Sequence, residues 1–233
     1  MLRVLTPPRV RGFEYLDDPN VDPRVVRRSI ADVATSNRFF GGTHAVLAEL
    51  EPLLRKHDAL TLLDVGSGAG DITASAQERA ARRNVRVSSF AIDSAEALAP
   101  VSKRRGNVAL CGDARKLPFP DRSMDVVVCS QVLHHFANDE ATKVILEMNR
   151  VARELVIVSD IRRSWFAAAG IWLASFPLRF HPVSRHDGVV SVMRGFTTSE
   201  LRELVWSAIG RKPAVRRHPL FRVTACWNPR AHD

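Results

Sequence analysis

Three closely spaced glycines, Gly66, Gly68 and Gly70, follow a short apolar run at residues 60–65. The run has the length of a buried parallel strand, and the alanine-rich stretch that begins at Ile72 is typical of a helix. Glycines let a ligand approach the backbone closely, and the free N–H groups at a helix N-terminus attract polar or anionic groups. The segment therefore predicts a strand, turn and helix that cradle a nucleotide-like ligand.

Carboxylates and histidines recur where later apolar runs end. Asp93 closes the second run, 23 positions after Gly70, near the offset at which a strand-end acid binds a ribose diol. Asp113 follows a third run, and His134 and His135 follow a fourth. Because the carboxyl ends of parallel strands share one edge of a sheet, these side chains are expected to lie near the glycine turn.

This ordered set resembles the class I S-adenosylmethionine (SAM)-dependent methyltransferases over roughly residues 59–160. A nicotinamide-binding fingerprint, the alternative, would need glycine at 71, where this chain has Asp71. The resemblance implies that Asp64 holds the methionine amino group, Asp93 the ribose hydroxyls and Asp113 the adenine amino group. The full set of cofactor contacts that it implies is Asp64, Gly66, Ser67, Gly68, Gly70, Asp93, Ser94, Asp113, Ala114, Ser130 and Gln131.

Two amphipathic patterns precede the glycine turn and predict helices over residues 25–34 and 43–56. Asp22, followed by Pro23, is a suitable N-cap for the first of them. Helices in this position often cover the active site in small-molecule methyltransferases. Asn37 and Arg38, between the two helices, are candidates to contact the cofactor carboxylate. Arg38 is the candidate bidentate donor, and an ordinary surface arginine is the alternative.

Methyl transfer to an oxygen requires a bound sulfonium, exclusion of water and a base for the proton of the acceptor hydroxyl. A phenol has a pKa of about 10, so a histidine base would help at neutral pH. His135 and then His134 are the leading candidates, because they follow the fourth strand at the methyl end of the cofactor. His186 is the alternative base, and the adjacent histidines could instead only shape the site. No metal-binding set is expected.

An almost wholly apolar stretch at residues 165–178 lies between arginines and is too short to span a bilayer. It follows the fifth predicted strand, at the edge of an α/β sheet where ligands bind. We therefore expect a cap over an apolar acceptor pocket, with a buried packing helix or shallow docking on a membrane surface as alternatives. The expected pocket residues are Trp165, Trp172, Phe176 and, from a polar loop after the cap, His181.

Apolar runs alternate with helical patterns between residues 59 and 160, which predicts β-α-β units and a parallel sheet. The resemblance implies a Rossmann-like α/β fold with a seven-stranded, mostly parallel sheet and helices on both faces. A further helix, capped by Thr197 or Thr198 and ended by Gly210, precedes a final antiparallel pair of strands.

The chain of 233 residues is long enough for one domain with additions. We expect an N-terminal segment and lid helices at 1–57 and a methyltransferase domain at 58–233, with the cap inserted at about 161–195. Three cysteines without metal-ligand or disulfide spacing, and no apolar leader, favour a reducing cytoplasmic setting.

The net charge of +9 comes from arginines that are scattered as isolated pairs. A nucleic-acid footprint would cluster on one element, so a basic surface is the favoured interpretation and a nucleic-acid partner is not expected. The oligomeric state stays open.

The motifs that this chain lacks narrow the range of possible methyl acceptors. The fourth strand is not followed by the Asn/Asp-Pro-Pro-aromatic stretch of amine and nucleobase methyltransferases, and the chain has no Pro-Cys nucleophile. The remaining pattern resembles small-molecule methyltransferases, including the ubiquinone and menaquinone biosynthesis group. We expect an enzyme of secondary metabolism that methylates a hydroxyl of an apolar aromatic, polyketide-like or quinol-like molecule. Methylation of ring carbon, a basic RNA or protein methyltransferase, and a binding module without catalysis are the alternatives.

Overall fold

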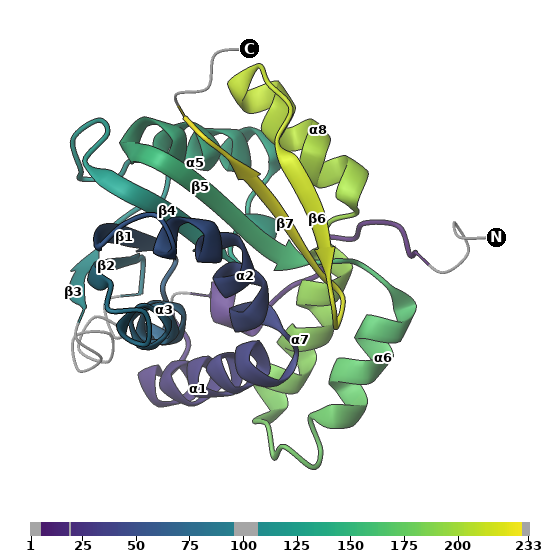
Figure 1. Cartoon of the computed structure of the whole chain (residues 1–233). Helices are drawn as coiled ribbons and strands as arrows, with labels where there is room; N and C mark the ends of the chain where they lie inside the picture. Colours follow the sequence, from purple (N-terminus) through teal and green to yellow (C-terminus); the bar gives the residue numbers. More distant parts are fainter. Residues whose placement is uncertain (1–5, 19, 96–106, 230–233) are drawn as a thin grey trace.

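A computed structural model describes residues 6–18, 20–95 and 107–229 (Figure 1). One sheet has the strand order β3-β2-β1-β4-β5-β7-β6, in which β7 runs opposite to the other six strands. The strands are β1 (Ala59–Val65), β2 (Arg86–Asp93), β3 (Val108–Cys111), β4 (Met124–Ser130), β5 (Ala152–Ile161), β6 (Ala214–His218) and β7 (Arg222–Trp227). The predicted fold class, a mostly parallel Rossmann-like sheet with helices on both faces, is confirmed.

The strand register brings the predicted cofactor segments together. Val65 at the end of β1 pairs with Ile92 of β2 on one side and with Cys129 of β4 on the other. The three strands therefore end at the same level, and the residues that follow them share one edge of the sheet. Continuous apolar runs such as residues 126–129 form these strands because both faces of the sheet are covered.

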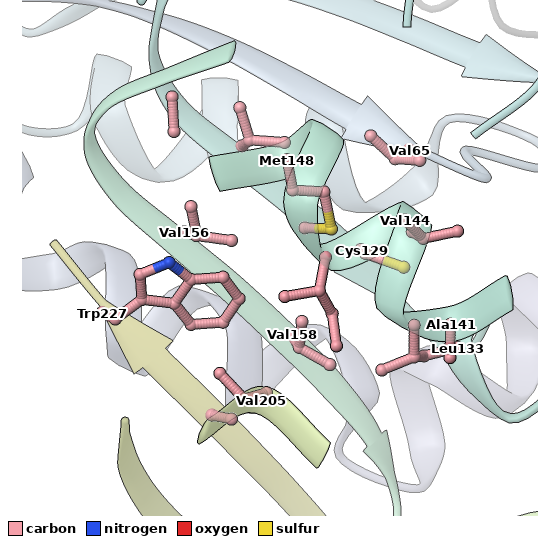
Figure 2. Packing of buried hydrophobic residues seen from close by; sticks show 14 of the residues in the cluster. Val65, Cys129, Leu133, Ala141, Val144, Met148, Val156, Val158, Val205 and Trp227 are labelled. Atoms are coloured by element: carbon pink, nitrogen blue, oxygen red, sulfur yellow. The ribbon is translucent and has the colours of Figure 1, made fainter. Parts of the chain in front are cut away.

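Helices α5 (Asn138–Val151) and α8 (Thr198–Ile209) cover one face of the sheet. Figure 2 shows this core, in which Met148 of α5, Val205 of α8 and Trp227 of β7 lie together. Helices α2 (Gly42–Leu54) and α3 (Asp71–Ala81) cover the other face.

The predicted boundaries of α8 are confirmed by its caps. The Thr197 hydroxyl accepts the backbone N–H of Glu200, and the Glu200 carboxylate accepts the backbone N–H of Thr197. This reciprocal pair satisfies two N–H groups that the helix cannot satisfy itself, and such caps typically contribute about 1 kcal/mol. Gly210 ends the helix in the left-handed conformation, with φ of 73°.

A third group of helices lies beyond the carboxyl ends of the parallel strands: α1 (Pro23–Phe39), α6 (Trp165–Ala174) and α7 (Pro182–Arg194). Figure 1 shows α1 beside α7, and α6 beside α7. The short turns η2 (Tyr15–Asp17) and η4 (Leu133–His135) lie next to α7. These segments cover the edge of the sheet at which a cofactor would bind.

The structure corrects several local expectations. α1 begins at Pro23 with Asp22 as its N-cap, as expected, but it continues to Phe39 and takes in Arg38. α2 begins at Gly42, and its N-cap position is a left-handed Gly41 without a side-chain cap. The expected polar loop after the cap is instead helix α7. The sequence of α7 does not show a helical repeat of apolar residues, because its buried residues include Ser184, Asp187 and Arg194, which are polar.

Candidate active site

A cavity of about 750 Å³ lies at the carboxyl ends of β1, β2 and β4. Its floor is the glycine turn and the ends of the strands, and its walls come from α1, α6, α7 and the N-terminal segment. Ten of the predicted cofactor residues line it: Asp64, Gly66, Ser67, Gly68, Asp93, Ser94, Asp113, Ala114, Ser130 and Gln131. Gly70 and Arg38 are not on the wall.

Gly66 begins the turn with φ of +73°. A Cβ atom here would lie 2.3 Å from Cγ2 of Val132, so only glycine lets the end of β1 pass beneath the residue that follows β4. Gly70 also has a positive φ and serves as the N-cap of α3. Gly70 therefore shapes the turn from behind the cavity.

Asp93 is held against the glycine turn by two backbone hydrogen bonds. Its Oδ2 atom accepts the N–H of Gly68 at 2.8 Å, and its Oδ1 atom accepts the N–H of Ala95 at 2.9 Å. The sequence predicted that the bend and this carboxylate meet, and the structure brings them together on one cavity wall. The hydrogen bonds fix the orientation in which the carboxylate meets a ligand.

Asp64 is a buried carboxylate with an unpaired oxygen. Within the described residues, its Oδ2 atom has no hydrogen-bond partner. Burial raises the pKa of Asp64 well above its usual value, and the neighbouring charges of Asp71 and Asp93 raise it further. A cationic group of a ligand would reverse this shift, because an opposite charge favours the ionised carboxylate.

Asp113 stands at the far end of the cavity and is half exposed. Hydrogen bonds from the side chain and backbone of Arg115 hold its pKa below the usual value. Ala114 and Ser94 lie on the same stretch of wall.

Of the two residues that the sequence placed near the cofactor carboxylate, Asn37 lines the cavity and Arg38 does not. Because successive helical residues point about 100° apart, α1 turns Asn37 into the cavity and leaves Arg38 exposed. The amide nitrogen of Asn37 donates to Asp71 at 3.1 Å, while its Oδ1 atom is buried without a partner in the described part of the chain. The bidentate role expected of Arg38 is therefore not supported.

Arg222, at the start of β7, is a wall residue that sequence reasoning missed. It is buried, and its Nη1 atom donates to Oε1 of Gln131 at 2.6 Å while Nε donates to the backbone oxygen of Phe40 at 2.8 Å. Burial lowers the pKa of Arg222 to about 10. A single arginine in a late strand carries no sequence signal, because only the pairing of β5 with β7 brings it here.

His134 faces the cavity from a fully buried position next to the end of β4. Its Nδ1 atom lies 2.7 Å from Oδ1 of Asp160 at the end of β5, and its backbone N–H donates to Oδ2. Burial by itself would raise the pKa of Asp160, but the charge and hydrogen bond of His134 outweigh it, so this pKa lies below the usual value. The Nε2 atom of His134 has no partner within the described residues.

His135 lies beside His134, with ring centroids 4.4 Å apart. Its Nδ1 atom is 2.8 Å from Asp17 and 3.7 Å from Glu14, both on the N-terminal segment. Arg194 of α7 pairs with the same two carboxylates, at 2.7 Å and 3.2 Å. The N-terminal segment thus supplies part of the cavity wall.

These side chains also have the composition of a metal site. Glu14, His134 and His135 each offer one ligand atom, and the three atoms lie within 4.8 Å of one another. Two imidazoles and a carboxylate suit zinc or iron. The sequence analysis, which expected no metal, missed this set because Glu14 is far from the histidines in the chain.

Two further predicted residues lie away from the cavity wall. His186 is half exposed, pairs with Asp187 at 2.9 Å and contacts the ring of Tyr15. His181 precedes α7 and accepts the backbone N–H of Val183, which makes it an N-cap. Neither residue lines the cavity. Asp187, next to His186, accepts the backbone N–H groups of Tyr15 and Leu16 and so anchors η2.

The cap lines the cavity with a different face from the one expected. Trp165, Trp172 and Phe176 are about half exposed and lie on the outer side of α6. The side chains and backbone that reach the wall belong to Phe166, Ala167, Gly170 and Ile171. α6 is apolar all round, so its sequence could not show which side faces inward.

The comparisons with known proteins agree with this geometry. A family model described as a methyltransferase domain matches residues 63–157. An uncharacterized methyltransferase of Schizosaccharomyces pombe is 25% identical over 156 residues, which are 65% of this chain and 60% of that protein. A second, methyltransferase-like protein of the same yeast is 30% identical over 43% of this chain and 38% of its own length. The chain thus spans 60% or less of these curated relatives.

Solved structures share the fold. A SAM-dependent methyltransferase from Aquifex aeolicus has a TM-score of 0.60 and 18% identity over 89% of this chain and 98% of its own. Human N-acetylserotonin methyltransferase in complex with SAM has a TM-score of 0.61 and 13% identity over 88% of this chain and 56% of its own. Residues 63–157 therefore match a methyltransferase domain, and the chain has the fold of these solved methyltransferase structures, as predicted.

Proposed function

We propose that this protein is a SAM-dependent methyltransferase that transfers a methyl group to a hydroxyl of an apolar aromatic, polyketide-like or quinol-like small molecule. Residues 1–57 act as a lid segment in this proposal, and residues 58–233 carry the transferase. Three free cysteines, of which Cys129 and Cys226 are buried, suit a reducing cytoplasmic setting.

One observation carries the proposal. Buried polar atoms without partners gather on the wall of this one cavity, and each such atom costs roughly 1–3 kcal/mol unless a ligand or water satisfies it. Within the described residues they are Asn37 Oδ1, Asp64 Oδ2, Ser130 Oγ, Gln131 Nε2 and His134 Nε2. An amino acid moiety with an ammonium and a carboxylate group offers the complementary donors and acceptors.

The residues present fit SAM. Asp64 would hold the ammonium group, Asp93 the ribose hydroxyls and Asp113 the adenine amino group. When bound, SAM supplies the electrophilic methyl group and leaves as S-adenosylhomocysteine. Arg222 donates a hydrogen bond to Gln131 at the end of β4. In this proposal the pair lies between SAM and the acceptor and helps to orient them.

The acceptor is proposed to bind between the histidines and α6, where Phe166, Ile171 and Val192 give an apolar wall. His134 is favoured over His135 as the base. Its Nδ1 atom is paired with Asp160, so the Nε2 atom that faces the cavity keeps its lone pair for the acceptor proton. The buried carboxylate then stabilises the imidazolium that forms.

The test combines binding with product analysis. Calorimetry is expected to show SAM binding by the wild type and its loss in Asp64→Ala, with Asp58→Ala, an exposed acid at the opposite edge of the sheet, as the matched control. Incubation with SAM and a library of hydroxylated aromatics should give a product whose mass rises by one methylene and whose fragments carry the methyl on oxygen. A product methylated on a ring carbon would mean that carbon, and not the hydroxyl oxygen, is the acceptor atom. Failure of the wild type to bind SAM would overturn the proposal.

A further inference from the structure

The outer face of α6 exposes an unusual number of large apolar side chains. Trp165, Phe166, Trp172, Leu173 and Phe176 are 51%, 60%, 48%, 61% and 47% exposed. Four of them lie on the ten residues of α6, and Phe176, just beyond its end, contacts the ring of Trp172, whereas scattered single exposures are normal on a protein surface. We call this set the outer α6 face.

The surroundings of the outer α6 face are basic. Residues 161–195 contain five arginines and one acid, Asp187, which is buried and bonded to backbone N–H groups. Arg162, Arg179 and Arg185 form no ion pair within the described residues. Arg185 lies over the ring of Phe176, 3.9 Å from its centroid. Aromatic side chains among unpaired arginines favour the boundary between lipid headgroups and acyl chains.

The same helix forms the inner wall of the cavity. Ala167, Gly170 and Ile171 line it, and Phe166 both lines it and is exposed to solvent. Phe166 thus belongs both to the cavity wall and to the outer α6 face. An apolar acceptor dissolved in a bilayer could reach the site from this side without crossing bulk water.

We propose that the outer α6 face docks on the surface of an anionic lipid bilayer and admits a membrane-dissolved acceptor to the cavity. This inference rests on the proposed function for the nature of the acceptor, but the docking itself does not. None of the helices within residues 6–18, 20–95 and 107–229 has the length and apolar character needed to cross a bilayer. The contact is therefore shallow: the rings of Trp165 and Trp172 enter the interface while the unpaired arginines meet lipid phosphates.

The structure offers a matched control on another part of the molecule. Trp206 of α8 is 47% exposed, nearly as much as Trp172, and also has a cation, Lys212, near its ring. Figure 1 shows α8 and α6 on well separated parts of the molecule. Trp172→Glu and Trp206→Glu therefore make the same chemical change at equal exposure, and only the first lies in the outer α6 face.

The experiment is co-sedimentation of the full chain with vesicles of phosphatidylcholine, alone or mixed equally with phosphatidylglycerol. Wild type should bind the mixed vesicles, and binding should weaken as salt is added. Trp172→Glu and Leu173→Glu should each lower the bound fraction by about tenfold or more, and Trp206→Glu should leave it unchanged. Sedimentation of the free protein and SAM calorimetry accompany each variant.

Several results would overturn the docking proposal: no binding to mixed vesicles, equal losses in Trp172→Glu and Trp206→Glu, or a wild-type dimer that only the α6 variants dissociate. The last result would assign the outer α6 face to a second copy of the chain. Loss of vesicle binding with unchanged SAM affinity concerns the docking surface alone. Absence of SAM binding in a protein that still binds vesicles would instead overturn the proposed function.

Discussion

Asp160 decides which nitrogen of His134 faces the acceptor. The carboxylate lies 2.7 Å from Nδ1 and also accepts the backbone N–H of Ile161, so it stays ionised and takes the Nδ1 proton as a hydrogen bond. Nε2 is then the basic nitrogen, and it is the buried atom that lacks a partner among the described residues. Asp160 is therefore a positioning residue that acts through His134.

We expect Asp160→Asn to lower kcat by about 10²–10⁴-fold, because an amide can donate to Nδ1 and so place the proton on Nε2. SAM affinity should stay unchanged, since the change lies away from Asp64 and Asp93. The measurement is the pH dependence of kcat with calorimetry of SAM binding. Ser159→Ala, a buried neighbour that does not line the cavity, is the control. Normal turnover in a folded Asp160→Asn protein would show that His134, paired with Asp160, is not the base.

The lone pair of Nε2 cannot serve a proton and a metal at once. If His134 is the base, zinc held by Glu14, His134 and His135 should inhibit turnover, and a chelator should restore it. Turnover of metal-free enzyme should equal that of the untreated enzyme. The measurement is initial rate against added Zn²⁺ and then EDTA, with His135→Ala as a variant in which inhibition weakens. Loss of activity on chelation, restored by Zn²⁺, would show that the three residues act as a metal site.

At this scale, the sequence predicts a residue well when its neighbours in the chain fix its place. Gly66 and Asp93 are such cases, since each directly follows or ends an apolar strand and the strands end together. Arg38 and Arg222 are the opposite case. Their place depends on the true end of α1 and on the pairing of β7, neither of which a local pattern determines.

Among the elements, the N-terminal segment gains its structure from α7. Arg194 holds Glu14 and Asp17 through ion pairs, and its Nε donates to the backbone oxygen of Gly12. Asp187 completes the attachment by accepting two N–H groups of η2. These contacts link residues more than 170 positions apart, so the structure of the segment depends on the placement of α7 by the rest of the chain.

Asp17 should make this attachment sensitive to acid. Burial would raise its pKa, but the hydrogen bonds and charges of His135 and Arg194 outweigh it and lower the pKa to about 2. Because an unfolded aspartate has a pKa of about 3.9, the stabilisation is complete above that value and is lost as the pH falls toward 2. We expect wild type to resist urea more than Asp17→Asn at pH 7, with the difference shrinking below pH 4.

Asp18→Asn is the matched control, because the Asp18 side chain bonds only to nearby Asn20 within the described residues. It should behave as wild type across the whole range. A constant difference between wild type and Asp17→Asn from pH 7 to pH 2 would mean that the Asp17 charge does not stabilise the segment.

The elements differ in how far their sequence reveals them. The parallel strands are predicted because continuous apolar runs between turns have few other structures open to them. α7 is missed because its buried side carries Asp187 and Arg194, which serve the N-terminal segment instead of an apolar core. α6 is found, but its inward face is not, because tryptophans on its outer side look like core residues in a sequence.

At the scale of the whole molecule, the cavity lies between the edge of the sheet and the helices that cover this edge. The sheet with α2, α3, α5 and α8 has its own two cores, and α6 and α7 pack through a smaller one. A ligand in the cavity would touch the sheet edge, α1 and α7 together. Ligand binding should therefore raise the free energy of unfolding, because the ligand adds contacts that join α1 and α7 to the sheet.

SAM should consequently raise the melting temperature. A ligand that binds only the folded state at 100 times its Kd adds about 2.7 kcal/mol, which for a chain of this size corresponds to about 5–11 °C. Asp93→Ala should abolish the rise, because the ribose hydroxyls lose their acceptor and the glycine turn loses the bond from Gly68. Asp58→Ala should keep it. Calorimetric melting of the three proteins with and without SAM measures the effect, and a full rise in Asp93→Ala would place the ribose elsewhere on the cavity wall.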